Sequence, residues 1–244
     1  RYKQGGGNSQ LGIPYRETSE VSEMARHTVE EVYSKINADL NEATSLLAGI
    51  KANDVNHYTE KVAWGLKARV ALAMQDYANA ANYAEKAIQL AEADGNKLME
   101  GDQLFCGFAD IATDTDEGMY VALTPDDQTV YFYSFYAYMS WNFSSTAIRQ
   151  GVKAINADTY DTMSETDLRR AWWDPTGKMD VPTTAFIKTE YQNRKFTARS
   201  TANAVGNVAF MRLAEMYLIA AEAYARAGQD AQAQDIFSRF QGTR

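Results

Sequence analysis

The chain contains one dense run of aromatic residues, "YFYSFYAYMSWNF", which carries eight rings in the thirteen positions 131–143. Flat rings suit the C–H-rich faces of sugars, because an aromatic face is electron-rich and a rigid ring loses little conformational entropy on binding. Nearby amide or guanidinium groups could then bond to the sugar hydroxyls. We therefore expect Trp141, Tyr136, Tyr138 and Asn142 to be ligand-binding candidates, with Trp141 the first choice for an exposed ring.

Core packing is the alternative explanation for most of these rings, because aromatic residues at this density usually fill an interior. If the run were a strand, successive side chains would alternate between two faces. One face would carry Tyr136 and Tyr138, and the opposite face would carry Trp141. Neither face is polar, so such a strand would be buried on both sides or would expose one ring-rich face.

A second candidate is the tryptophan pair Trp172 and Trp173 in "RRAWWDPTGK". The Pro-Thr-Gly turn that follows favours exposure of at least one ring. The alternative is that one tryptophan covers Arg169 or Arg170 in a cation–π contact.

Residues suited to catalysis or metal binding are sparse. The two histidines, His27 and His57, lie at a helix start and in a linker, and the sequence shows no partner for either. It contains no metalloprotease, α/β-hydrolase or phosphate-loop motif. The acidic stretch 110–118, "DIATDTDEG", lacks the spacing of an EF-hand loop and is better read as a solvated acidic loop. We therefore expect a non-catalytic protein with no catalytic residues, no metal and no cofactor.

The composition is that of a globular protein, with 244 residues, 45% of them hydrophobic and 23% charged. A net charge of -8 argues against a nucleic-acid partner, which would require clustered basic residues. No apolar run is long enough to span a bilayer. The single cysteine, Cys106, excludes an internal disulfide. No export signal is visible at the start of the sequence. We interpret the sequence as a mature fragment, so the missing signal does not argue against secretion.

Three stretches predict helices. Residues 28–48 place apolar side chains at helical spacing and begin with a capping box formed by Thr28 and Glu31. Residues 59–94 hold two helices, and the short turn "MQDY" between them requires antiparallel packing. Residues 211–237 repeat this pattern, with Ala221 standing where the first copy has Ala68. Small residues at matched positions are typical of a tetratricopeptide-type repeat.

The predicted fold is therefore mostly α: tetratricopeptide-like helix pairs form a scaffold, and a loop-rich aromatic inserted region contains short strands. In the insertion, "GMYVALT" and "TVYFYSF" predict strands, and residues 157–173 predict a short helix and a helix-like turn. We expect a single domain over residues 1–244, with a loop-rich lead-in at 1–27, repeat helices at 28–95, the inserted region at 96–206 and a C-terminal helix pair at 207–240.

Several stretches, in order along the chain, resemble signature segments of the SusD/RagB family. The stretch "NVAFMRLAEMYLIAAEAYARAGQDAQA" is similar to the hallmark helix pair of that family. "HTVEEVYSKINADLNEATSLL" and "KVAWGLKARVALAMQDYANAANYAEKAI" are similar to its earlier repeat helices. "GIPY" and the stretch that contains Asp167 and Arg169 also stand where the family has related motifs. Members are usually longer, so we expect a truncated or shortened member.

The resemblance implies a lipoprotein on the extracellular face of an outer membrane, attached only through a lipid anchor that lies outside this sequence. It also implies a SusC-like TonB-dependent transporter as partner. The ligand would be an oligosaccharide or polysaccharide, or in some relatives a peptide, and it would be captured without being cleaved.

The predicted function is that of a non-catalytic cell-surface glycan-binding protein that captures oligo- or polysaccharide for a TonB-dependent outer-membrane transporter. The alternative is a tetratricopeptide-like protein-interaction scaffold without glycan affinity, whose partner would contact the repeat helices. A surface hydrolase is a third hypothesis. It would need a pair of carboxyl groups at a defined separation in space, which a sequence does not reveal.

Overall fold

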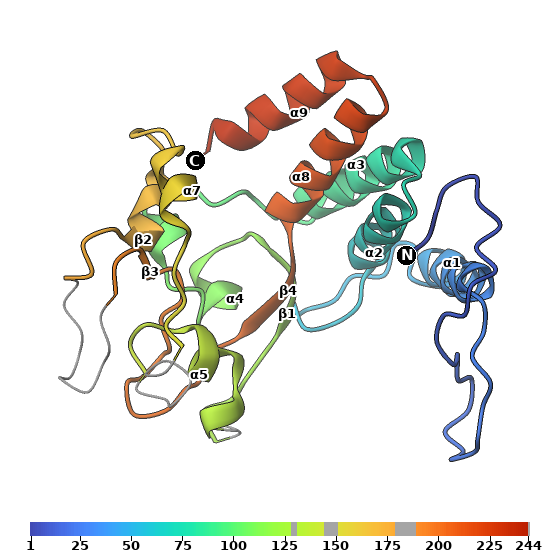
Figure 1. The fold of residues 1–244 in the computed structure, drawn as a ribbon, viewed down its shortest axis with the longest axis horizontal. Coiled ribbons are helices and arrows are strands. Elements are labelled where there is room, and N and C mark those ends of the chain that lie inside the picture. Colours follow the sequence, from blue (N-terminus) through green and yellow to red (C-terminus); the bar gives the residue numbers. More distant parts are fainter. Residues whose placement is uncertain (128–130, 144–150, 179–188, 244) are drawn as a thin grey trace. The chain divides into compact units, whose positions relative to one another are not determined.

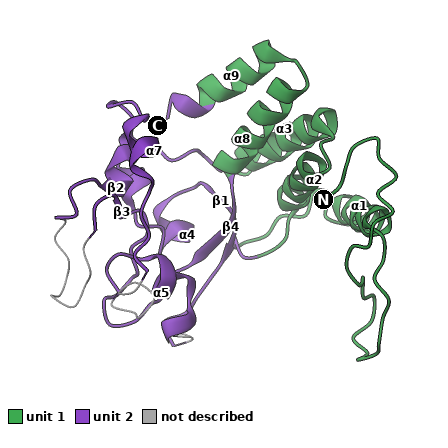
Figure 2. Ribbon diagram, viewed as in Figure 1, with its two compact units in different colours: residues 1–53, 57–94, 213–239 green, residues 54–56, 95–212, 240–244 purple. Residues whose placement is uncertain are grey.

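The computed structural model describes residues 1–127, 131–143, 151–178 and 189–243. The chain divides into two compact units, shown in green and purple in Figure 2. A helical unit comprises residues 1–53, 57–94 and 213–239, and a second unit comprises residues 54–56, 95–212 and 240–244. The single domain over 1–244 stays a prediction.

The helical unit contains the predicted helices, which are confirmed (Figure 1). They are α1 (Val29–Leu46), α2 (Glu60–Ala73), α3 (Tyr77–Ala93), α8 (Leu213–Arg226) and α9 (Asp230–Gln241), the last of which ends in the second unit. Alanines line the packed faces, with Ala68, Ala84 and Ala220 fully buried. Because an alanine adds only a methyl group, helix axes can approach closely, as the repeat pattern predicted.

The start of α1 is fixed by the predicted capping box. The Thr28 side chain accepts a hydrogen bond from the backbone N–H of Glu31, and the Glu31 carboxylate accepts one from the backbone N–H of Thr28. The hydrogen bond from the Thr28 N–H is also the main reason that the pKa of the Glu31 carboxyl is lowered. Two N–H groups that a helix start leaves unpaired are thereby satisfied.

Helices α3 and α8 are joined by two matched tyrosine–glutamate contacts. The Tyr217 hydroxyl donates to the Glu92 carboxylate, and the Tyr224 hydroxyl bonds to Glu85. The two tyrosines are seven positions apart on α8, and the two glutamates are seven positions apart on α3. Seven positions are about two helical turns, so the two contacts lie in one row along the packed helices. Burial and these carboxylates raise the pKa of both phenols to about 12.

The second unit contains short elements connected by loops. Its strands are β1 (Gly118–Ala122) and β4 (Val208–Arg212), which pair antiparallel, and β2 (Trp173–Asp174) and β3 (Gln192–Asn193), which form another antiparallel pair. Its short helices are η1 (Gly101–Phe105), α4 (Ile111–Asp114), η2 (Tyr131–Tyr133), α5 (Phe135–Met139), α7 (Ala157–Asp161) and η3 (Leu168–Trp172). The strand in "GMYVALT" and the helical turns in 157–173 are confirmed.

The strand predicted in "TVYFYSF" is wrong over its described residues, because residues 131–139 form η2 and α5 (Figure 1). The cause is the hydrogen bonding of Ser134, which is local on one side and long-range on the other. The Ser134 hydroxyl accepts from the backbone N–H of Ala137 and donates to the carbonyl of Ala204, so it caps a helix at this point. Residues Thr129 and Val130 of that stretch lie outside the described residues.

An ion pair stabilises the base of the β1–β4 pair. Glu117 is fully buried, accepts a hydrogen bond from the backbone N–H of Met99, and lies 2.8 Å from the Arg212 guanidinium. Arg212 also lies over the Phe108 ring, which belongs to an apolar cluster with Leu104 and Val121. None of the helices in the described ranges is both long and apolar enough to cross a membrane.

Candidate ligand-binding surface

The short helix α5 divides the aromatic run into a buried side and an exposed side. Tyr136 and Ala137 are buried, whereas Phe135 and Tyr138, which are neighbours at i, i+3 on the helix surface, are exposed. Residues before the helix add further exposed rings. We call the exposed set the ring surface, and it comprises Phe132, Tyr133, Phe135 and Tyr138.

The rings of this surface differ in how firmly they are held. Phe135 packs edge to face on Phe196 with ring centroids 5.0 Å apart. Phe132 contacts Phe143 at 6.1 Å. Tyr133 and Tyr138 are 80% and 43% exposed. The surface thus combines anchored phenylalanines with two phenols that can reach a ligand.

Tyr136 is not exposed, and the expectation that placed it beside Tyr138 on an exposed face is wrong. Its side chain is 1% exposed, and its hydroxyl donates to the carbonyl of Asn207 at 3.1 Å. The ring lies flat against Gly206, where an added Cβ would be 2.4 Å from a ring carbon. Burial raises the pKa of this phenol, which stays protonated. Tyr136 holds the run onto the apolar cluster that contains Phe143 and Ala204.

Asn142 is also buried, so it does not present its amide at a surface. Its Nδ2 donates to the carbonyl of Ala198 at 2.9 Å, and its Oδ1 accepts from the backbone N–H of Ala198 at 2.7 Å. A short polar side chain that follows an aromatic run suggested exposure. The Asn142 amide bonds to both backbone groups of Ala198, as a neighbouring strand would, so its role is structural.

Trp141 is half-buried, with one ring face near a cation. Its Nε1 donates to the Thr197 hydroxyl at 2.9 Å, and its backbone N–H donates to the carbonyl of Phe196. The guanidinium of the exposed Arg194 lies 5.8 Å from the ring centroid. Trp141 is therefore held in a fixed orientation beside a group that can donate hydrogen bonds to hydroxyls.

The two tryptophans after η3 have different surroundings. Trp172 is half-buried, its Nε1 donates to the carbonyl of Leu104 at 2.6 Å, and the Lys195 ammonium lies 4.4 Å from its ring centroid. The expected cation–π contact therefore forms with Lys195 rather than with Arg169 or Arg170. Trp173 is half-buried and pairs through its backbone with Asn193.

The two arginines of that stretch have other partners. Arg169 forms hydrogen bonds with Asp167, and this pairing lowers the pKa of the Asp167 carboxyl. Arg170 stacks 4.1 Å from the ring centroid of Tyr160. Both guanidinium groups thus stabilise the turn that contains η3.

The segment 192–198 brings the two sequence candidates together. The Asn193 side chain donates to the carbonyl of Met139 at the end of α5, while its backbone pairs with Trp173. The next residue, Arg194, donates its N–H to the carbonyl of Trp172 and extends its guanidinium toward Trp141. The aromatic run and the tryptophan pair are thus attached to opposite edges of one extended segment.

Sequence reasoning missed Arg194 and most of the ring surface. Phe132, Tyr133 and Phe135 were not selected because a strand alternation was assumed for the run. A helical period over residues 135–138 would have separated Tyr136 from Tyr138 and grouped Tyr138 with Phe135. No local signal marked Arg194, since its place beside Trp141 depends on a pairing more than fifty residues away in sequence.

The acidic stretch 110–118 is engaged in ion pairs. Asp110 accepts from the Arg199 guanidinium, a contact that raises the pKa of that arginine, and Glu117 is held by Arg212. Over the described part of the chain, no three His, Cys, Asp or Glu side chains gather as metal ligands would.

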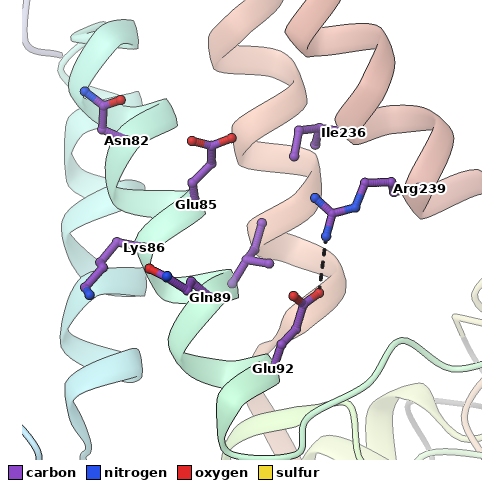
Figure 3. A pocket seen from close by; sticks show the side chains of 8 residues that line it. Asn82, Glu85, Lys86, Gln89, Glu92, Ile236 and Arg239 are labelled. Atoms are coloured by element: carbon purple, nitrogen blue, oxygen red, sulfur yellow. Dashed lines mark hydrogen bonds and ion pairs between the residues drawn. The ribbon is translucent and has the colours of Figure 1, made fainter.

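A groove on the helical unit offers a different chemistry (Figure 3). It has a volume of about 470 Å³ and lies between α3 and α9. Arg239 of α9 reaches across to the carboxylate of Glu92 at 3.4 Å. Its lining carries amide, charged and aliphatic side chains without an aromatic ring: Asn82, Glu85, Lys86, Ile88, Gln89, Glu92, Ile236 and Arg239.

Solved structures show the same fold. A SusD-like carbohydrate binding protein from Bacteroides vulgatus superposes with a TM-score of 0.77 at 21% sequence identity, over 100% of this chain and 50% of that one. A SusD superfamily protein from Bacteroides thetaiotaomicron gives a TM-score of 0.72 at 17% identity, covering 98% and 53%. Surface glycan-binding protein A from Bacteroides fluxus gives 0.66 at 22%, covering 95% and 55%. The chain thus spans about half the length of these proteins.

No curated protein matches the chain in sequence. The profile described as the SusD family matches residues 30–239, which includes all five long helices but for the ends of α1 and α9. The match covers most of the chain and agrees with the shared fold. The chain belongs to the SusD family.

Proposed function

We propose that this chain is the glycan-binding part of a non-catalytic cell-surface protein, which captures oligo- or polysaccharide for a TonB-dependent outer-membrane transporter. Membership of the SusD family supports the proposal, as do the glycan- and carbohydrate-binding names of structures that share the fold. The observation that carries it is the ring surface, whose exposed phenols lie on the same segment as Trp141, the ring that Arg194 approaches from the segment 192–198.

The geometry suits stacking against sugar rings. Tyr138 follows Phe135 by three positions on α5, so one helix face presents both rings to the outside. Trp141 is already hydrogen-bonded to Thr197, so its ring loses little conformational entropy when a ligand binds. Arg194 supplies several N–H donors in a planar fork, and sugar hydroxyls accept such bonds. A ligand that stacks on the phenols would then be oriented by the guanidinium.

Binding without cleavage is part of the proposal. Most glycosidases place two carboxyl groups across the scissile bond. The segment 131–143 contains no acidic residue, and the carboxylate of Asp167, which precedes the tryptophan pair in sequence, is hydrogen-bonded to Arg169. Incubation of the purified protein with polysaccharides and assay of new reducing ends would test this part, and release of product would contradict it.

The first experiment is affinity electrophoresis in native gels that contain soluble plant, fungal or host polysaccharides. Tyr138→Ala and Tyr133→Ala remove exposed phenols and leave the buried side of the run unchanged, so both should fold. We expect one polysaccharide to retard the wild type and the variants to be retarded less. Loss of one stacked ring at about 1 kcal/mol corresponds to roughly fivefold weaker binding.

Phe105→Ala is the matched control, because Phe105 is 42% exposed in the same unit but lies outside the ring surface. Retardation of the control should equal that of the wild type. If all three variants bind as well as the wild type, the ligand site lies elsewhere. If no polysaccharide retards the wild type, glycan capture is wrong for this chain.

The partner and location belong to the same proposal. We expect a SusC-like transporter as partner and attachment to the outer face of the outer membrane through a lipid anchor outside this sequence. Family membership is the support. A tagged protein isolated from its own outer membranes should bring a TonB-dependent transporter with it, and protease added to intact cells should cleave the tag.

A protein-interaction scaffold is the second candidate, and the groove between α3 and α9 is the observation that favours it (Figure 3). Its mixed charges at Lys86, Glu92 and Arg239 are typical of a polar protein contact. Lys86→Glu would then abolish binding of a partner while leaving retardation by polysaccharide unchanged. The opposite result, loss of retardation, would contradict both site assignments.

A further inference from the structure

A second hollow in the helical unit has the chemistry that the groove between α3 and α9 lacks. It lies where the end of α2, the start of α3 and the end of α8 meet, and the lead-in and α1 close one side. Its volume is about 370 Å³, within the range of roughly 300–1,000 Å³ that small-molecule sites occupy. The lining includes Tyr2, Tyr33, Gln75, Tyr77, Glu222 and Arg226.

Three tyrosine rings face this pocket from three different elements. Tyr2 and Tyr33 meet edge to face with ring centroids 5.0 Å apart. Tyr77, the first residue of α3, lies 5.6 Å from the guanidinium carbon of Arg226. All three tyrosines are half-buried, so each ring is packed on one side and reachable on another. Such rings offer flat surfaces at little entropic cost.

The polar groups supply both donors and acceptors. Arg226 donates through Nε to the Glu222 carboxylate at 2.7 Å and also bonds to the Tyr77 side chain, and its planar guanidinium carries further N–H donors. Glu222 has a second oxygen that can accept from a hydroxyl. Sugar hydroxyls donate and accept at once, so a paired guanidinium and carboxylate beside an aromatic face match them. An anionic ligand would be repelled by the Glu222 carboxylate. An apolar ligand would bury the polar groups of the pocket without forming hydrogen bonds to them.

Gln75 provides an independent observation. It adopts a φ of 63°, in the left-handed region that favours glycine, two positions after the last residue of α2. Its N–H donates to the carbonyl of Leu72, so the backbone has the geometry of a helix C-cap. A glycine would adopt this φ with less strain. Instead the position carries a long amide that lines the pocket. Strain of this kind is typical of ligand sites.

We propose that this pocket is a second sugar-binding site, which holds a short oligosaccharide by stacking on the tyrosines and by hydrogen bonds to Gln75, Glu222 and Arg226. The inference rests on the proposed function, because it takes the ligand to be a glycan. It adds a site on the helical unit that differs in its residues from the ring surface. A trisaccharide is short enough to be held at this pocket alone.

The test is isothermal titration with a panel of trisaccharides: cellotriose, laminaritriose, maltotriose and xylotriose. The variants are Gln75→Gly, Tyr77→Ala and, at the ring surface, Tyr138→Ala. Phe237→Ala is the control, because it removes an exposed ring from the helical unit outside the pocket. We expect Gln75→Gly and Tyr77→Ala to bind a trisaccharide at least fivefold more weakly at the pocket. Binding at the ring surface, which Tyr138→Ala weakens, should be unchanged in these two variants.

Gln75→Gly separates binding from folding. Glycine accepts the positive φ, so this variant should unfold at the same temperature as the wild type or higher, even though it binds less ligand. Unchanged titrations for Gln75→Gly and Tyr77→Ala, with Tyr138→Ala still weakening binding, would overturn the second site and leave the proposed function intact. If trisaccharides do not bind although polysaccharides retard the protein, the second site is also wrong. If neither binds, both proposals fail.

Discussion

Tyr136 and Tyr138 stand two positions apart and should respond to mutation in opposite ways. Tyr136 is 1% exposed and donates its hydroxyl hydrogen to the Asn207 carbonyl, whereas Tyr138 is 43% exposed on the ring surface. Tyr136→Phe should therefore lower stability without affecting glycan binding. Tyr138→Ala should weaken glycan binding without lowering stability.

The size of the first effect follows from the contact that is lost. Phenylalanine keeps the packing of the ring but leaves the buried carbonyl of Asn207 without its tyrosine donor. An unsatisfied buried polar group costs about 1–3 kcal/mol, so we expect a loss near 1.5 kcal/mol in the free energy of unfolding. For a chain of this size, each kcal/mol lowers the melting temperature by about 2–4 °C. The expected decrease is about 4 °C.

Two measurements on the same protein samples check this prediction. Thermal unfolding followed by circular dichroism gives the melting temperature, and polysaccharide affinity gels give the binding. Tyr138→Ala should melt within about 2 °C of the wild type, since exposed substitutions change stability by less than about 0.5 kcal/mol. The assignment is refuted if Tyr136→Phe loses retardation at full stability, or if Tyr138→Ala melts as early as Tyr136→Phe.

Three further predictions concern the packing that holds the site. Gly206→Ala should destabilise the protein by about 1–3 kcal/mol, measured by urea unfolding, because the new methyl group would meet the Tyr136 ring. Glu117→Gln should cost about 3–5 kcal/mol in the same assay, because it leaves Arg212 without its buried partner; a loss below 1 kcal/mol would contradict the ion pair. Stability should fall as pH rises from about 10 to about 12, because the folded state raises the pKa of Tyr217 to about 12 and so retains a proton that the unfolded chain releases. Tyr217→Phe should reduce this slope in unfolding measured from pH 9 to 12, and an unchanged slope would count against the Tyr217–Glu92 contact.

The helical scaffold could be predicted from sequence because its signals are local. The capping box at Thr28 and Glu31 involves residues three positions apart, and the alanine pattern of α2, α3 and α8 repeats at helical spacing. Local hydrogen bonds and small residues on one face decide such elements before any long-range contact forms. The family resemblance rested on the same residues and is confirmed by the family match.

The candidate site was less predictable because its geometry depends on distant contacts. Ser134 caps α5 and also bonds to Ala204, seventy residues further along the chain. That cap converts a run of strand-forming aromatics into a helical turn, and the side-chain period changes from two to about 3.6. Tyr136 then faces Gly206, and Tyr138 faces outward. Composition alone favoured Tyr136 and Tyr138 equally as ligand-binding residues, since both are tyrosines in the same run.

The segment 192–198 explains how a loop-rich unit can hold a precise surface. Asn193 is buried and uses its side chain and its backbone for different neighbours, the end of α5 and the strand β2. Arg194 is thereby fixed between the carbonyl of Trp172 and the ring of Trp141. A loop holds a side chain in one position only when the polar groups of the loop are hydrogen-bonded to the segments on either side of it. Asn193→Ala should therefore release Arg194 and Trp141 together. It should weaken polysaccharide retardation even though Asn193 itself is 4% exposed and does not face the ligand. A variant that retains full retardation would show that the ring surface does not depend on this segment.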